Sequence, residues 1–290
     1  MPGLDPRFPL PPGDGRSRLL GGGSGSKEQR NVWVAVLSTL AFFGVIAIII
    51  VRSPGWAAVQ QTFFDREVLL YSLPKILRRF VTDIFIFVVA ECVVLVLALV
   101  LAVLRSLQGS VFTPLRLLAI GYIDVFRGIP TILVILLLGV GMPALGLQGV
   151  PKSERFWAIV ALVLVYSAYV AEVYRAGIES VHPSQAAAAR SLGLSRSKSL
   201  RFVILPQAVR RVLPPLLNDF IGLQKDAALV FVLGVVDGLG QANIISSAKF
   251  DFTPFVALAL VYLVITIPQT RFVDHMIQRD RRRRLAGGAA

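Results

Sequence analysis

The sequence is poor in the residues on which most enzyme sites depend. It holds one cysteine, Cys92, and two histidines, His182 and His275, among 290 residues. A single cysteine excludes an intrachain disulfide, and its place inside an apolar run favours a packing role. Neither histidine belongs to a ligand cluster, so we expect no metal site. A membrane-embedded enzyme is the poorest interpretation, because no Ser/His/Asp set has a plausible placement.

Charge is also scarce. Only 16% of the residues are charged and 55% are hydrophobic, with a mean hydropathy of +0.71. This composition is far from that of a soluble domain and predicts an all-α membrane protein. The net charge of +13 would suggest nucleic acid in a soluble chain, but here Lys and Arg stand between apolar runs. Base-stacking platforms are missing as well, so we expect no nucleic-acid partner.

Two further sequence features are absent: an ATP-binding motif and an internal repeat. The sequence has no Gly-x-x-x-x-Gly-Lys-Ser/Thr phosphate cradle, since "GGGSGSK" (21–27) and "GLSRSKS" (193–199) lack the Gly-Lys step. We therefore expect no ATPase site and no bound cofactor in this chain. No internal repeat is evident, which leaves an inverted-repeat secondary transporter without direct support.

The apolar runs predict six membrane crossings. A helix needs about 20 apolar residues to cross the bilayer core. The expected crossings are 32–51, 84–104, 113–145, 156–171, 207–226 and 252–268. Gly128 and Pro130 should interrupt the third, which crosses once. Residues 227–236 are too short to span and indicate a half-buried hairpin or a re-entrant segment.

Basic residues predict the orientation. Residues 172–211 hold seven Lys/Arg against two acids, and Arg279–Arg284 adds five more, so both segments are expected in the cytoplasm. The arginine run should also anchor the chain to anionic lipids. Six crossings then place both termini in the cytoplasm. This topology places segment 52–83 on the extracytoplasmic side, although it carries the basic residues Lys75, Arg78 and Arg79. An amphipathic helix at the membrane interface would accommodate these three cations.

The same features divide the chain. Residues 1–30 lack the basic region, short apolar stretch and cleavage site that follow one another in a signal peptide. We expect them to form a disordered cytoplasmic tail. Residues 31–80 form an additional N-terminal transmembrane helix and an extracytoplasmic loop. The main transmembrane domain covers 81–275, and 276–290 is a basic cytoplasmic tail.

One stretch breaks the apolar pattern. "AAAARSLGLSRSKSLRFVILP" (186–206) contains four cationic residues and no acid. Ser184 is a plausible N-cap for a helix over 185–192, and Gly193 then permits a turn. Ser195 caps a second short helix that Pro206 should close. We expect two short helices on the cytoplasmic membrane face, shaped to dock another surface.

This stretch resembles the cytoplasmic loop of the integral-membrane subunits of ATP-binding-cassette (ABC) importers. That loop reads Glu-Ala-Ala, three residues, Gly, nine residues, Ile, one residue, Leu-Pro. The matching positions are Ala187, Ala188, Ala189, Gly193, Val203, Leu205 and Pro206. Ala187 stands where the family has Glu, a change that keeps the helix and its packing.

Over residues 80–275 the chain is most similar to the permeases for polar amino acids. Three blocks carry this likeness: "YIDVFRGIPTILV" (122–134), "SAYVAEVYRAGIESV" (167–181) and "VILPQAVRRVLPPLLNDFIGLQKDAAL" (203–229). The resemblance implies a type I ABC importer permease in the cell membrane of a prokaryote, coupled through loop 184–205. It would carry a glutamate- or glutamine-like or basic amino acid inward from an extracytoplasmic binding protein. Its partners would be two ATPase subunits that bind ATP and Mg, and a second permease subunit, identical or homologous.

Intramembrane ionisable groups are the candidates for handling such a zwitterion. A carboxylate can hold the ammonium group, and an arginine can hold the carboxylate. The candidates are Arg127, Glu172, Asp219, Lys225 and Asp226.

Each candidate has a structural alternative. Glu172 can pair with Arg175 or with the cytoplasmic end of a helix, and Arg127 can reach the lipid headgroups or pair with Asp124. Lys225 and Asp226 can form a mutual or interhelical ion pair, while Asp219 can bond between helices. A stand-alone channel or ion-coupled carrier that uses Glu91, Glu172, Asp219 and Asp226 is the alternative function.

Overall fold

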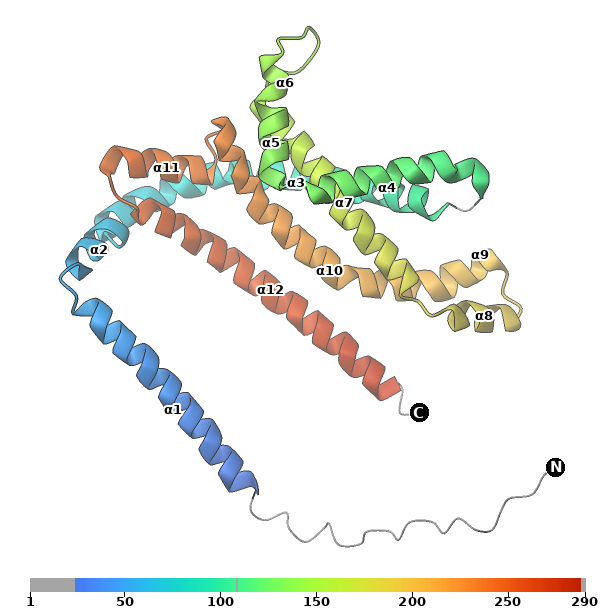
Figure 1. Ribbon diagram of the computed structural model, residues 1–290, viewed down its shortest axis with the longest axis horizontal. Coiled ribbons are helices and arrows are strands. Elements are labelled where there is room, and N and C mark those ends of the chain that lie inside the picture. Colours follow the sequence, from blue (N-terminus) through green and yellow to red (C-terminus); the bar gives the residue numbers. More distant parts are fainter. Residues whose placement is uncertain (1–23, 108, 288–290) are drawn as a thin grey trace. The chain divides into compact units, whose positions relative to one another are not determined.

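The computed structural model describes residues 24–107 and 109–287, which are almost entirely helical (Figure 1). The chain divides into two compact units, 1–60 and 61–290, and each is treated separately. The elements are α1 (Ser24–Val51), α2 (Trp56–Phe63), α3 (Arg66–Ser106), η1 (Ser110–Phe112), α4 (Thr113–Gly128), α5 (Thr131–Gly139), α6 (Gly141–Ala144), α7 (Glu154–Glu179), α8 (Pro183–Ser191), α9 (Arg196–Ser199), η2 (Leu200–Ile204), α10 (Leu205–Asp226), η3 (Ala227–Leu233), α11 (Gly238–Lys249) and α12 (Thr253–Gly287).

The described helices confirm an all-α membrane protein. Four of them are long and apolar enough to cross a membrane: those within Gln29–Val51, Trp56–Ser106, Glu154–Glu179 and Thr253–Arg279. Two bent pairs raise the number to six if each pair makes one span. The first pair bends by 101° between α4 and α5, because Pro130 holds the backbone extended at the expected break. The second bends by 50° before α11.

Helix α3 begins much earlier than the sequence predicted. With 41 residues it is about 60 Å long, roughly twice the thickness of the bilayer core. Residues 66–80, expected in an extracytoplasmic loop, are therefore helical and continuous with the predicted crossing at 84–104. Asp65 caps the helix by accepting the N–H groups of Glu67 (2.8 Å) and Val68 (3.0 Å). A buried stripe of Val68, Ser72, Ile76 and Phe80 continues the core face of the helix, while the three cations expected there are exposed.

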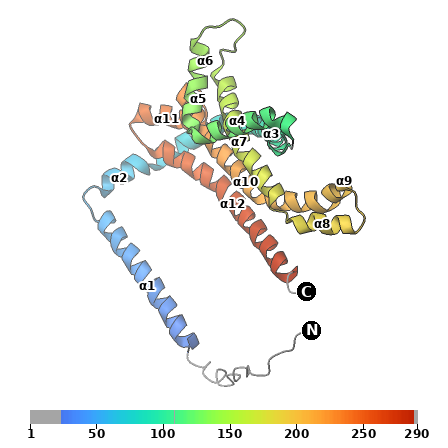
Figure 2. The same cartoon turned by 45° about the vertical axis from the view of Figure 1, so that its right-hand side comes forward.

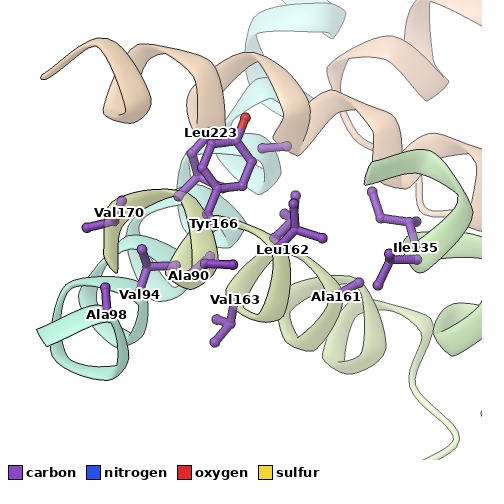
Figure 3. Close-up of a cluster of buried hydrophobic side chains, with 14 of the residues drawn as sticks. Ala90, Val94, Ala98, Ile135, Ala161, Leu162, Val163, Tyr166, Val170 and Leu223 are labelled. Atoms are coloured by element: carbon purple, nitrogen blue, oxygen red, sulfur yellow. The ribbon is translucent and has the colours of Figure 1, made fainter. Parts of the chain in front are cut away.

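The main core surrounds α7. Helix α3 packs along α7, with α4, α5 and α10 around them. Small residues on α3, Ala90 and Ala98, let its backbone approach α7 closely, and Ala161 of α7 lies beside Ile135 of α5 (Figure 3). Leu162 is fully buried in this layer, and Tyr166 points from α7 toward α10.

A second core joins the first half of α3 to α11 and α12 through Ile76, Phe80, Ala242, Ala257, Leu258 and Val261. Two buried carboxylates fix the start of α11 beside it. Asp237 caps the helix by accepting the Gly240 N–H (2.6 Å), and Asp83 of α3 accepts the Gly238 N–H (2.8 Å). Residues 227–233, for which a hairpin or a re-entrant segment was expected, form 3-10 helix η3, which Gly234 caps with φ +82° before α11 starts. The 50° bend that follows is compatible with a re-entrant segment.

Helices α8 and α9 lie where α7 ends and α10 begins, away from α11 in both views (Figures 1 and 2). Helix α8 starts at Pro183 with His182 as its N-cap, two residues before the predicted N-cap Ser184. It ends as predicted at Gly193, whose φ is +82°. The N–H groups of Gly193 and Leu194 donate to the carbonyls of Arg190 and Ala189, the pattern of a Schellman motif.

The second short helix does not close at Pro206. The chain passes from α9 through π-helix η2 directly into α10, where Pro206 lies in the first turn. Proline is tolerated there because the first N–H groups of a helix have no partner inside it. We name residues 183–205 the docking element.

The ends of the chain are also more helical than predicted. Residues 24–30, expected in a disordered tail, belong to α1, and α12 continues through the basic segment to Gly287. Good helix formers next to an apolar run extend such a helix. The remainder of the expected N-terminal tail, 1–23, lies outside the described residues.

Candidate functional site

A cavity of about 590 Å³ opens between α4, α7 and α10. It brings together three of the five predicted candidates, one from each helix: Arg127, Glu172 and Asp219. Its other polar lining residues are Tyr169, Ser180 and Arg211. Side chains of both charge signs therefore line the cavity.

One corner of the cavity is formed by Arg127, Tyr169 and Asp219. Arg127 stands in the last turn of α4, just before the break at Pro130, and its guanidinium carbon lies 5.7 Å from the centre of the Tyr169 ring. Asp219 is close enough to Arg127 for electrostatic attraction. Its Oδ2 atom is buried and has no hydrogen-bond partner among the described residues. Asp219 lines the cavity, and this oxygen is not tied to another group in the described part of the chain.

Glu172 is occupied by arginines. Its Oε1 accepts from Arg105 of α3, and its Oε2 accepts from Arg175 at 2.7 Å (Nη2) and 3.1 Å (Nε). Arg175 also pairs with Glu179 one turn further along α7. This geometry favours the pairing alternative for Glu172, with Arg105 as a partner that the sequence did not indicate. The network ties the end of α3 to the end of α7.

At the opposite end of the cavity, α7 packs directly against α10. Arg211 of α10 donates to the carbonyl of Ser180, the residue that caps α7. One turn earlier Gly177 lies so close to Val212 that a Cβ atom at this position would overlap the valine side chain. This contact stands directly before the docking element.

Lys225 and Asp226 do not line the cavity, so the structure separates them from the other candidates. Asp226 accepts a hydrogen bond from the Tyr166 hydroxyl of α7 (2.9 Å), and Lys225 is exposed. No ion pair joins Lys225 to Asp226, both of which belong to the described chain. The two residues follow Asp219 by nearly two turns, beyond the end of the cavity.

Sequence reasoning missed Tyr169, Ser180 and Arg211. A helical-wheel argument would have found them, because Tyr169 precedes Glu172 by three residues and Arg211 precedes Asp219 by two steps of four. The missing information was which face of each helix meets its neighbour.

In the docking element, the residues that match the importer pattern are partly exposed. Ala187, Ala188, Leu205 and Pro206 face outward, Ala189 is buried and Val203 is half-buried. Gly193 supplies the left-handed turn between the helices. The pattern thus presents a small, smooth surface on α8.

Membrane-length helices around a cavity of mixed charge define a multi-pass membrane protein of the transport class. The chain belongs to the family described as binding-protein-dependent transport system inner membrane component, which matches residues 95–282. This confirms the predicted resemblance to importer permeases and the predicted permease function.

Two relatives illustrate the branch. The chain is 38% identical over 186 residues to the probable glutamine ABC transporter permease protein GlnM of Bacillus subtilis (strain 168), covering 63% of this chain and 83% of that protein. It is 33% identical over 218 residues to the arginine transport system permease protein ArtQ of the same strain, covering 74% and 96%.

Solved structures agree with this placement. A crystal structure of an amino acid ABC transporter with histidines matches with a TM-score of 0.67 and 33% identity, over 74% of this chain and 98% of that one. The MetNI methionine ABC transporter in an inward-facing conformation matches with a TM-score of 0.52 at 19% identity, over 73% and 99%. The second likeness concerns the fold alone.

Proposed function

We propose that this chain is the permease subunit of an ATP-driven importer for a polar amino acid, glutamate- or glutamine-like or basic, in the cell membrane of a prokaryote. The observation that carries the proposal is the cavity that Arg127 and Asp219 both line, with no described hydrogen-bond partner for Asp219 Oδ2. Relatives named for glutamine and arginine transport support the solute class.

The cavity suits the backbone groups of an amino acid. The guanidinium of Arg127 can donate paired hydrogen bonds to the α-carboxylate, and Asp219 can accept from the α-ammonium. The Tyr169 ring beside Arg127 limits how the guanidinium turns. We assign these residues to the solute path, whereas Glu172 and Asp226 position the helices around it and Lys225 has no part in the cavity.

The energy would come from partner chains. Two ATPase subunits, which hold ATP and Mg, grip the docking element from the cytoplasm, and this chain itself binds no cofactor. An extracytoplasmic binding protein delivers the solute, and a second permease subunit completes the path. The N- and C-termini lie in the cytoplasm. Helix α7 precedes the docking element, α10 follows it, and both helices line the cavity. Closure of the two ATPase subunits would therefore reorient both helices and change the shape of the cavity.

Reconstitution tests this proposal. The permease would be purified with the ATPase that accompanies it, placed in liposomes and supplied with the purified binding protein. Uptake of radiolabelled glutamate, glutamine and arginine is then measured with ATP inside. We expect uptake of one of them that requires ATP hydrolysis and survives an ionophore.

Two results would contradict it. Uptake without any ATPase, or uptake that collapses with the proton or sodium gradient while ATP is maintained, would indicate an ion-coupled carrier. A catalytically inactive variant of the ATPase is the matched control, because it preserves the assembly and removes only ATP hydrolysis.

A further inference from the structure

A second cavity lies inside the docking element itself. It measures about 420 Å³ and is lined by Ala186, Arg190, Ser199, Leu200 and Ile204. Ala186 and Arg190 stand four residues apart on one face of α8. The other three residues come from the end of α9 and from η2, so two segments that meet after the Gly193 turn enclose the space.

The buried polar group in this cavity has no partner. Ser199 is only 2% exposed, and its Oγ makes no hydrogen bond within the described part of the chain. Burying a hydroxyl without a partner is unfavourable, so such groups normally meet an acceptor. The cavity therefore presents an unused donor beside an arginine.

The backbone next to Ser199 is irregular. The Leu205 N–H donates to the carbonyl of Leu200, five residues back, which makes η2 a π-helical turn. Pro206 follows and has no N–H to donate to Phe202, so the ordinary helical spacing cannot be maintained here. The wide turn places Leu200 and Ile204 at the cavity wall, and π-turns are frequent at functional sites.

The charge of the surroundings selects the ligand. Residues 186–206 contain four cations and no acid, so no carboxylate within the element is available to Arg190. The remaining walls are apolar, which suits a short side chain that ends in a charged acceptor. Exposed apolar residues lie around it, with Leu192 84% and Phe202 62% exposed.

We propose that this cavity receives a carboxylate side chain, Asp or Glu, from the ATPase subunit. The inference rests on the proposed function and adds which charge each side of the contact carries. The permease supplies the cation, and the ATPase supplies the carboxylate. Arg190 pairs with the carboxylate, and the Ser199 hydroxyl donates to its second oxygen. Ala187, with only a methyl group, offers no polar contact of its own beside it.

The first experiment measures association. The tagged permease is purified from the cells that express it, and the ATPase that accompanies it is identified and quantified. We expect Arg190→Glu to reduce the recovered ATPase at least about tenfold, because it places two acids together in the contact. Ser199→Ala should weaken association by roughly two- to tenfold through the lost hydrogen bond.

Arg201→Glu is the matched control. Arg201 carries the same charge in the same element but lies over the Phe202 ring, outside the cavity. We expect it to retain most of the ATPase. All variants are compared by thermal unfolding in detergent, so that misfolding is recognised.

The second experiment identifies the acid. In the purified complex, Arg190→Lys places an amine in the cavity, and a carbodiimide then joins it to a carboxylate within reach. We expect mass spectrometry to find position 190 linked to an Asp or Glu of the ATPase, while Arg201→Lys yields no such link at position 201. Changing that acid to Lys should restore the association of the Arg190→Glu permease.

The outcomes separate the two proposals. A wild-type permease that retains no ATPase would contradict the proposed function. A wild-type complex that persists unchanged with Arg190→Glu, or a link to the ATPase only from position 201, would overturn this inference alone. Binding of anionic lipid vesicles that depends on Arg190, without any effect on ATPase recovery, would assign the cavity to a lipid headgroup and overturn it as well.

Discussion

At the scale of single residues, hydrogen-bond partners distinguish two carboxylates that look alike in the sequence. Glu172 and Asp219 both line the cavity. Both oxygens of Glu172 are taken by arginines, whereas one oxygen of Asp219 is buried without a described partner. A carboxylate whose oxygens are all bonded within its own chain stabilises the fold, so of the two we propose Asp219 for the solute path.

Neutralising Asp219 should therefore weaken solute binding. Asp219→Asn removes the charge that attracts the ammonium group, and a hydrogen bond to a charged group contributes about 1.5–3 kcal/mol. We expect the apparent affinity for uptake to fall roughly 10- to 100-fold in reconstituted vesicles. Asp226→Asn is the matched control, since an amide oxygen can still accept from Tyr166. Equal losses in both variants would contradict the assignment.

The contributions of Glu172 and Arg105 to the stability of the fold should depend on each other. Glu172→Gln and Arg105→Gln each break the link between α3 and α7, so their effects on unfolding should not add. We expect an interaction free energy of about 0.5–3 kcal/mol in the double-mutant cycle, measured by thermal or denaturant unfolding in detergent. Strictly additive effects would show that the pair contributes no stability.

At the scale of elements, close helix contacts place the cavity walls next to the docking element. Gly177 on α7 touches Val212 on α10, and Arg211 bonds to the end of α7 one turn further on. The two helices thus move as a pair at the point where the docking element begins. Any larger side chain here would separate them.

Gly177→Ala should destabilise the fold by about 1–3 kcal/mol, because the new methyl group overlaps a β-branched side chain that cannot turn away. Val212→Ala removes the overlapping atoms, so the double variant should recover much of the loss. Unfolding midpoints of the four proteins test this. Failure of Val212→Ala to compensate would show that the contact is not the cause.

Helix α3 connects both cores, and Asp83 is its polar contact to α11. Asp83→Leu leaves the Gly238 N–H without its acceptor in a buried place, which should cost about 1–3 kcal/mol. Asp83→Asn keeps an oxygen for that bond and should cost less. Hydrogen exchange at the start of α11 is the measurement, and equal protection in both variants would contradict a role for the bond.

At the scale of the whole molecule, both cores lie within residues 61–290. The family match at 95–282 and the cavity fall in the same unit. Helix α1 belongs to the other unit and none of its described apolar residues is buried. The transport apparatus is therefore contained in the second unit.

A chain that starts at Gln61 should accordingly fold. We expect its unfolding midpoint in detergent to stay within a few degrees of that of the full chain, because no core residue is removed. Recovery of the ATPase partner should also persist. Loss of monodisperse protein would show that α1 stabilises the second unit.

The sequence by itself determined the all-helical class, the break at Pro130 and the turn at Gly193. These depend on local chemistry: apolar length, a fixed proline φ and the freedom of glycine in the left-handed region. It also placed Arg127, Glu172 and Asp219 among the candidates, since charged groups are rare in apolar segments.

Only the tertiary structure decided what those charges do. Arg105 lies 67 residues from Glu172, and Asp83 lies 155 residues from Gly238, so no local pattern indicates that they bond. The early start of α3 and the existence of α11 follow from burial against distant helices. Partner choice is a property of packed faces, and a helical sequence shows its faces without showing which neighbour each one meets.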